Sequence, residues 1–168
     1  VISGNILSGR SDIFAANERG ENFLYYNDNG KFVELAKDYA VDDFYQNGRG
    51  TSLSDIYYRG RLDIVTSNWE GPHRVFVLKN DKFVDIANDL FKDPSRIRTV
   101  ISADFDNDGY DEVFMNNIGE PNKLFKILDN GEFKEINIEN ALETNGLGTG
   151  AAVADIDGDG VLELLISH

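Results

Sequence analysis

The sequence contains no cysteine, so it forms neither disulfide bonds nor a zinc site built from thiolates. No apolar run approaches the length of about 18 residues that a membrane-spanning helix needs. Basic residues are also few: 16 lysines and arginines stand against 30 aspartates and glutamates, which leaves a net charge of −14. This acidic balance argues against binding to nucleic acid or to an anionic membrane surface, because both select basic proteins. The lack of a long apolar run argues against insertion into a membrane.

Acidic residues concentrate in two nine-residue segments, 104–112 and 155–163, that share the pattern D-x-D-x-D-G-x-x-E. Side-chain oxygens at loop positions 1, 3, 5 and 9 can surround a hard cation, and calcium takes about six to eight oxygen ligands. The glycine at position 6 allows a sharp turn, so that the carbonyl of position 7 can also face the ion. The pattern therefore predicts one Ca²⁺ in each segment. The candidate ligands are Asp104, Asp106, Asp108, Tyr110 (carbonyl) and Glu112 in the first, and Asp155, Asp157, Asp159, Val161 (carbonyl) and Glu163 in the second.

Two alternative interpretations of these segments fit less well. A solvated surface turn is disfavoured by two copies of the complete pattern, and the carboxylates of 104–112 would repel one another without a cation. An EF-hand needs a bidentate glutamate at position 12, where this chain has Met115 and Ile166. The short apolar runs that follow position 9 suit buried strands. The predicted sites therefore belong to a β-protein.

The position-9 carboxylate recurs along the chain at spacings of 51, 49 and 51 residues. Its four copies are Asp12, Asp63, Glu112 and Glu163. An apolar run follows each copy, and in three repeats an asparagine stands five residues after it. The residues ten positions after it are Asn22, His73 and Asn122. A second strand-like run, a tight turn and a third run follow, and the turns include Asn27-Asp28-Asn29-Gly30, Lys79-Asn80-Asp81 and Asp129-Asn130-Gly131.

With an inner strand before each acidic loop, these runs make about four strands in roughly 50 residues, which is typical of propeller blades. The predicted fold class is all-β, a β-propeller of four-stranded blades with repeats of about 50 residues. Residues 1–168 hold three complete blades plus partial ones, and we expect a single β-propeller segment that is part of a larger propeller. Because an open segment exposes strand edges, it should lie within a longer chain or against a protein partner.

The two remaining copies of the loop have lost most of their oxygen ligands. In the copy that ends at Asp63, Arg59 places a positive charge at position 5. In the copy that ends at Asp12, the only carboxylate at a ligand position is that of Asp12 itself. We expect the turn to persist in both copies and calcium to bind at neither.

The motifs DFDNDGYDEVF at 104–114 and DIDGDGVLELLI at 155–166 resemble the calcium-binding β-propeller repeats of the FG-GAP/VCBS family. The pattern of residues 17–36, with Gly-Arg-Gly at 48–50 in the next copy, is similar to the cartilage acidic protein (ASPIC/UnbV-associated) group of these repeats. The resemblance implies structural calcium sites and a role in adhesion, extracellular recognition or protein assembly. It also implies an extracellular, periplasmic or other calcium-rich location.

Catalysis is not predicted from the few candidate groups. His73 occupies the position of Asn22 and Asn122, which favours a structural role, and His168 is the last residue. Serines of the inner strands, such as Ser54 and Ser102, have no basic partner at a recognisable spacing.

The interpretation that the sequence favours is a non-catalytic, calcium-binding scaffold for protein interaction, adhesion or assembly. The alternative is a calcium-dependent carbohydrate-binding propeller, or a polysaccharide lyase or hydrolase. Trp69 bears on this choice, since it could stack on a sugar, anchor an interface or only pack between blades.

Overall fold

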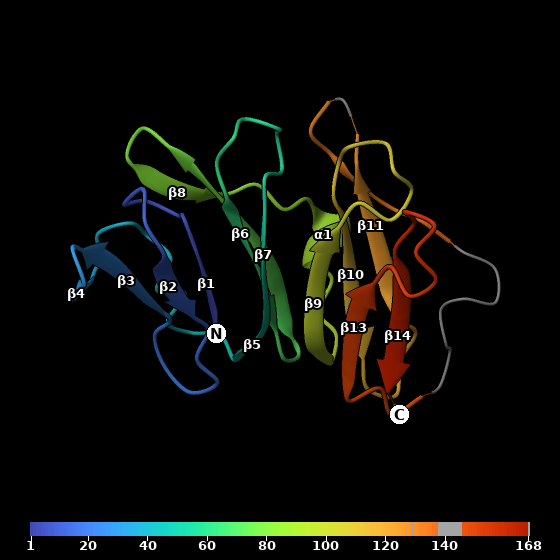
Figure 1. The fold of residues 1–168 in the computed structure, drawn as a ribbon. Helices are drawn as coiled ribbons and strands as arrows, with labels where there is room; N and C mark the ends of the chain where they lie inside the picture. The colour runs from blue at the N-terminus through green and yellow to red at the C-terminus, as the bar shows by residue number, and fades with distance from the viewer. Residues whose placement is uncertain (129, 138–145, 168) are drawn as a thin grey trace.

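The computed structural model describes residues 1–128, 130–137 and 146–167, which form an all-β fold with one short helix. Three four-stranded antiparallel sheets and one two-stranded sheet follow one another along the chain, and in each the strands lie in sequence order. Figure 1 shows the sheets side by side, from β1–β4 at one end to β13 and β14 at the other. The all-β class and the four strands per complete repeat are confirmed.

The strands of each sheet have the following bounds. The first sheet contains β1 (Ile2–Gly4), β2 (Asp12–Ala15), β3 (Phe23–Asp28) and β4 (Lys31–Glu34). The second contains β5 (Gly48–Ser54), β6 (Asp63–Asn68), β7 (Gly71–Lys79) and β8 (Lys82–Asp85). The third contains β9 (Ile97–Ala103), β10 (Glu112–Asn117), β11 (Lys123–Ile127) and β12 (Phe133–Glu135), and the fourth contains β13 (Gly150–Ala154) and β14 (Glu163–Ser167). The position-9 carboxylate is thus the first residue of the second strand in every sheet.

Tight turns of the predicted kind join the third and fourth strands. Asn29 and Gly30 have φ angles of 53° and 91°, and Asn80 and Asp81 have φ angles of 49° and 62°. Positive φ at both central residues is the geometry of a type I′ turn, whose twist matches that of the flanking strands. Asp129, in the third predicted turn, lies outside the described residues.

The hydrophobic core consists of two clusters on opposite faces of the second sheet. Side chains of a strand alternate between faces, so β6 sends Val65 to one cluster and Ile64 to the other. In β7, Val75 and Phe76 divide in the same way. All six residues of β6 are buried, as expected for a sheet that is covered on both faces.

The first strands of neighbouring sheets approach one another closely. β5 contacts both β1 and β9, and β9 also contacts β13. At Gly50 in β5, an added Cβ would lie 2.9 Å from the backbone nitrogen of Val100 in β9. Glycine is required there because any larger residue would force the two strands apart.

A short helix, α1 (Asp89–Lys92), which the strand pattern of the repeat does not predict, occupies part of the loop between the second and third sheets. Asn88 caps it, with Oδ1 accepting from Phe91 N at 3.0 Å, while Nδ2 donates to the carbonyl of Phe133 at 2.8 Å. The ring of Phe91 packs between those of Phe125 and Phe133, with centroids 4.8 and 4.5 Å away. Within the described residues, no helix is long and apolar enough to cross a membrane.

Trp69 packs at the junction between the second and third sheets. Its backbone N–H donates to Asn47, and it forms an isolated bridge with Ser95. The guanidinium of Arg49 lies 4.5 Å from the ring centroid. The half-buried ring therefore matches the structural interpretation better than that of a sugar platform.

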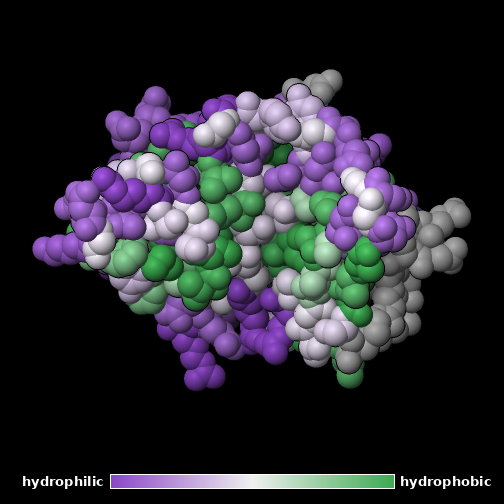
Figure 2. All heavy atoms as spheres, viewed as in Figure 1, coloured by the Kyte–Doolittle hydropathy of each residue, from purple (hydrophilic) through white to green (hydrophobic). Residues whose placement is uncertain are grey.

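Apolar side chains are exposed on the two-stranded sheet. A shallow depression there is lined by Ala151, Ala152, Leu165 and Ile166. Figure 2 shows apolar residues gathered at this position on the visible face, between polar loops. Leu165 is 49% exposed, which is unusual for a leucine in a strand.

Candidate metal centres

The two acidic segments connect the first and second strands of the third and fourth sheets. In the first, carboxylate oxygens of Asp104, Asp106 and Asp108 lie within 4.8 Å of one another. In the second, the same holds for Asp155, Asp157 and Glu163. Each loop thus brings together three of its four predicted carboxylate ligands, and such oxygen clusters suit calcium.

Both loops are shaped by the same hydrogen bonds from the backbone. The position-1 aspartate accepts from the position-6 glycine, at 2.9 Å between Asp104 Oδ2 and Gly109 N and at 3.0 Å between Asp155 Oδ2 and Gly160 N. The glycines have φ angles of 93° and 89°, in the region that other residues rarely adopt. The sequence pattern therefore folds the loop in the same way twice.

The position-7 residues expose their side chains and lie beside the position-5 aspartates. Tyr110 N donates to Asp108 Oδ1 at 2.9 Å, and Val161 N donates to Asp159 Oδ1 at 2.8 Å. The carbonyl ligation predicted for Tyr110 and Val161 stays a prediction.

The position-9 glutamates are fixed by one carboxylate oxygen. Glu112 Oε2 accepts from Phe105 N at 2.9 Å, and Glu163 Oε2 accepts from Ile156 N at 2.7 Å. The other oxygen of Glu112, Oε1, is buried and receives no hydrogen bond. Burial raises the pKa of Glu112, although the bond from Phe105 opposes this. A buried oxygen without a donor is costly, so Glu112 fits a site that holds a cation.

Lys126 of β11 lies against the first loop, a contact that the sequence analysis missed. Its Nζ is 2.6 Å from Asp106 Oδ2, 2.5 Å from Asp108 Oδ2 and 3.5 Å from Glu112 Oε1. Hydrogen bonds to Asp106 and Asp108 raise the pKa of Lys126 and keep the ammonium charged. Its position fourteen residues after Glu112 follows from the hairpin of β10 and β11, in which Phe125 is opposite Val113.

In the second repeat, an arginine occupies the loop. Arg59 Nη2 donates to both oxygens of Asp63 at 2.9 Å, and Asp63 is fully buried. Burial raises the pKa of Asp63, and the charge of Arg59 opposes that shift. The guanidinium therefore neutralises the position-9 carboxylate of this loop, and the absence of calcium there stays a prediction.

In the first repeat, backbone groups take the place of a cation. Asp12 accepts from the backbone N–H groups of Leu7, Ser8 and Asn27 at 2.7, 2.9 and 2.9 Å. Burial opposes the ionisation of Asp12, but these hydrogen bonds outweigh it and lower its pKa. A carboxylate that is already satisfied in this way has little need for a metal ion.

Side-chain contacts tie neighbouring loops into a row. Ser54 Oγ donates to Asp111 at 2.7 Å, and the Tyr58 and Tyr110 rings pack with centroids 4.9 Å apart. Asn107 Nδ2 donates to the carbonyl of Gly160 at 3.0 Å, which joins the two acidic loops. The predicted metal centres are therefore adjacent on one side of the molecule.

A polar clip recurs near the end of the second strand in the three complete repeats. The backbone N–H groups of Asn17 and Asn117 each donate to the side-chain oxygen of the asparagine five residues later, at 3.0 and 2.8 Å. In the second repeat Asn68 N donates to His73 Nδ1 at 3.1 Å. The structural role predicted for His73 agrees with this contact.

His73 also faces the hydroxyl of Ser95, with Nε2 3.0 Å from Oγ, and both residues are buried. Because Nδ1 accepts the backbone N–H of Asn68, the proton of the neutral ring sits on Nε2, which donates to Ser95. A histidine in this tautomer cannot take the serine proton, so the pair is structural. Burial, followed by the charge of Lys123, lowers the pKa of His73 to about 4.

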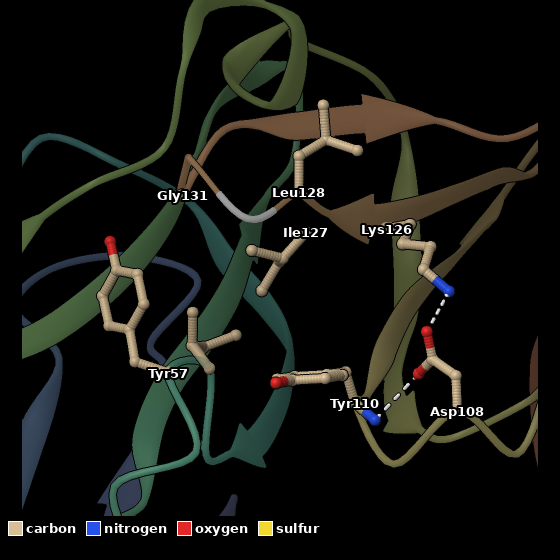
Figure 3. A pocket seen from close by; sticks show the side chains of 8 residues that line it. Tyr57, Asp108, Tyr110, Lys126, Ile127, Leu128 and Gly131 are labelled. Atoms are coloured by element: carbon tan, nitrogen blue, oxygen red, sulfur yellow. Dashed lines mark hydrogen bonds and ion pairs between the residues drawn. The ribbon is translucent and has the colours of Figure 1, made fainter.

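A pocket of about 280 Å³ opens beside the first acidic loop, between the second and third sheets. Tyr57 and Tyr110 line it together with Asp108 and Lys126. Figure 3 shows Tyr57 at one end of the pocket and Tyr110 beside Asp108, whose ion pair with Lys126 lies at the other end. The pocket therefore shares two of its residues with the predicted metal centre.

Comparison with known proteins agrees with these features. The sequence profile of the FG-GAP-like repeat matches residues 55–115 and 104–166. The chain is 48% identical to cartilage acidic protein 1 of Mus musculus over 179 aligned positions, which cover 98% of this chain and 28% of that protein. The protein of the same name in Xenopus tropicalis is 48% identical, over 96% of this chain and 27% of that protein. The one in Homo sapiens is 46% identical, over 98% of this chain and 27% of that protein.

The chain thus spans little more than a quarter of the length of these relatives. Neither the family description nor the relatives' name denotes an enzyme. The resemblance noted from the acidic motifs is confirmed, and the matched repeats cover most of the described sheets: the chain belongs to the FG-GAP-like repeat family.

Proposed function

We propose that this chain is a calcium-stabilised, non-catalytic segment of a β-propeller that acts as a scaffold in protein interaction, adhesion or assembly. The observation that carries the proposal is the pair of adjacent loops, each with three carboxylates whose oxygens lie within 4.8 Å of one another. The buried Oε1 of Glu112, which receives no hydrogen bond, supports a cation in the first loop. A cation there would lower the repulsion among the carboxylates and hold the loop in its present shape.

The propeller architecture rests on how the sheets pack. Four-stranded antiparallel sheets follow one another in a row, their first strands meet, and the second sheet is covered on both faces. The sheets at the two ends bear exposed apolar residues, among them Phe32 in β4 and Leu165 in β14. We propose that further blades of a longer chain, or a protein partner, cover these faces, because unpaired strand edges and apolar faces favour association.

The proposed environment is extracellular, periplasmic or another calcium-rich lumen. Several of the carboxylates in both loops are exposed, and calcium modules that work outside cells bind at about 0.1–1 mM. The net charge of −14 is compatible with such a surface, since calcium and basic partners are attracted to it.

Thermal unfolding in EDTA and in millimolar calcium tests the structural role of the ion. A ligand that binds only the folded state stabilises it by about 2.7 kcal/mol at a hundredfold excess over its Kd. We expect a higher midpoint in calcium. Equal midpoints would contradict the proposal.

Single substitutions assign the ions to the two loops. We expect Asp106→Ala and Asp157→Ala each to remove one calcium in a calorimetric titration, because each deletes the position-3 ligand of its loop. Tyr57→Ala is the control, since Tyr57 stands at position 3 of the loop whose cage Arg59 already fills. A third calcium, or no loss in the aspartate variants, would count against the assignment.

Carbohydrate binding is a second candidate, favoured by the pocket beside the first loop. Tyr57 and Tyr110 offer aromatic faces there, and Asp108 and Lys126 offer hydrogen-bonding groups. Titration with acidic oligosaccharides in calcium tests it, and Tyr57→Ala should abolish binding without changing the calcium stoichiometry. Turnover of the oligosaccharide would favour the lyase or hydrolase alternative instead.

Sedimentation of the 168-residue chain in calcium tests its assembly. We expect the isolated chain to self-associate rather than persist as a free monomer, because both end sheets are open. A monodisperse monomer with a cooperative melt would contradict this expectation.

A further inference from the structure

We infer that Lys126 is an internal counter-ion of the first acidic loop, and that a divalent cation must displace its ammonium before it can bind there. Lys126 would then set the calcium affinity of this loop. The inference rests on the proposed calcium binding and concerns which residue of this chain controls it.

The ammonium and the metal ion would share the same oxygens. Lys126 Nζ contacts Asp106 and Asp108, which are the predicted ligands at positions 3 and 5, and also lies 3.5 Å from Oε1 of Glu112 at position 9. That oxygen is buried and lacks a hydrogen bond, so it remains available to an ion. A lysine ammonium carries one positive charge and three N–H donors. One positive charge does not neutralise the several carboxylates of the loop.

The lysine is not required by the architecture of the sheet. The second and third strands pair in the same register in the three complete repeats. The residue that follows the position-9 carboxylate is opposite Tyr25, Phe76 or Phe125. The next residues are Tyr26, Val77 and Lys126. Since the same place accepts a tyrosine and a valine, a neutral side chain at 126 is compatible with the blade.

The structure also offers space for the displaced side chain. Lys126 lines the pocket of about 280 Å³ beside the loop, together with Tyr57 and Tyr110 (Figure 3). The flexible lysine stem can move its ammonium from the carboxylates into this pocket without any change in the backbone. Displacement is therefore a change of side-chain conformation.

The test uses the Asp157→Asn protein, in which the second loop is disabled, and measures calcium binding to the first loop by calorimetry. We expect Lys126→Met to lower the Kd about tenfold, on the order of the effect of one charged contact. Lys126→Gln should act in the same direction and serves if the methionine variant folds poorly. Lys123→Met is the matched control, because it makes the same charge change on β11 but removes a pair with Asp93 instead.

Thermal unfolding separates this role from a purely structural one. Without calcium, the neutral variants at 126 should melt below the parent protein, because the carboxylates lose their counter-ion. With saturating calcium, they should gain more than the parent does. A merely structural lysine would lower both midpoints by the same amount, and that result would overturn the inference.

The outcomes distinguish the two proposals. An unchanged or higher Kd in both neutral variants, with calcium still bound by the parent, overturns the role of Lys126 alone. Absence of calcium binding in the parent and in both variants overturns the proposed metal centre and this inference with it.

Discussion

Mild acid should destabilise the second sheet through His73. The ring is fully buried, its Nδ1 accepts the N–H of Asn68, and its Nε2 donates to Ser95. Protonation of Nδ1 would remove the acceptor and place a charge in a buried site. Burial, followed by the charge of Lys123, lowers the pKa of His73 from 6.5 to about 4, while Asp93 opposes the shift.

The sign of the effect follows from the two pKa values. The unfolded chain takes up the proton near pH 6.5 and the folded chain only near pH 4, so between these values the unfolded state binds more protons. The free energy of unfolding is therefore highest above pH 6.5 and falls as the pH drops. The pKa difference corresponds to a loss of about 2 kcal/mol by pH 5 and about 3 kcal/mol by pH 4.

His73→Asn isolates this contribution. In the first and third repeats Asn22 and Asn122 accept the equivalent backbone N–H, so asparagine at 73 can replace Nδ1 with an amide oxygen that does not titrate. Urea unfolding of both proteins at pH 7.5 and pH 5, in the same calcium concentration, gives four free energies. The wild-type protein should lose about 2 kcal/mol more than the variant between the two pH values. An equal loss in both proteins would refute the reasoning.

Two further predictions concern packing and charge, and urea unfolding at pH 7.5 measures both. Phe91→Ala should lower the free energy of unfolding by about 3–5 kcal/mol, because it removes a fully buried ring between β11 and β12, whereas Phe32→Ala, at a side chain 46% exposed, should cost far less. Arg59→Ala should cost about 2–3 kcal/mol, because it leaves the buried carboxylate of Asp63 without its cation, whereas Arg61→Ala at an exposed position should have little effect. A cost for Arg59→Ala no larger than for Arg61→Ala would contradict the second prediction.

The sequence predicted the repeat and its strands because both depend on local rules. Alternating apolar residues, Asn-Gly turns and the acidic motif each act within a few residues, and each reappears about every 50 residues. Helix α1 escaped prediction because four residues carry too little periodicity, although Asn88 followed by Asp89 is a helix-start signal. Its stability comes from Phe91 packing against β11 and β12, a contact between repeats that no local pattern encodes.

In the candidate site, too, the residues that lie close together in the sequence were predicted, and those that reach it from other segments were not. The motif named the carboxylates that gather in each loop, because the ligands lie within nine consecutive residues. Lys126 and Ser95 were missed because their contacts with Glu112 and His73 join residues that lie 14 and 22 positions apart in the sequence. The signal for Lys126 was present in the alignment of the repeats, where a tyrosine and a valine stand at its position.

The position-9 carboxylate is the element of the repeat that most needs compensation, because the fold buries Asp12, Asp63 and Glu112 and half-buries Glu163 at the start of the second strand. Asp12 is compensated by backbone N–H groups and Asp63 by the guanidinium of Arg59. Glu112 has one backbone bond at Oε2, and its Oε1 receives no hydrogen bond but lies 3.5 Å from the ammonium of Lys126. Within the described residues, Glu163 has one backbone bond and no ion pair. Backbone groups and Arg59 thus satisfy this carboxylate in the first two repeats, whereas in the last two it has a single backbone hydrogen bond and belongs to a loop with carboxylates at positions 1, 3, 5 and 9. The contacts of this carboxylate, together with the acidic residues of each loop, distinguish the third and fourth loops from the first two.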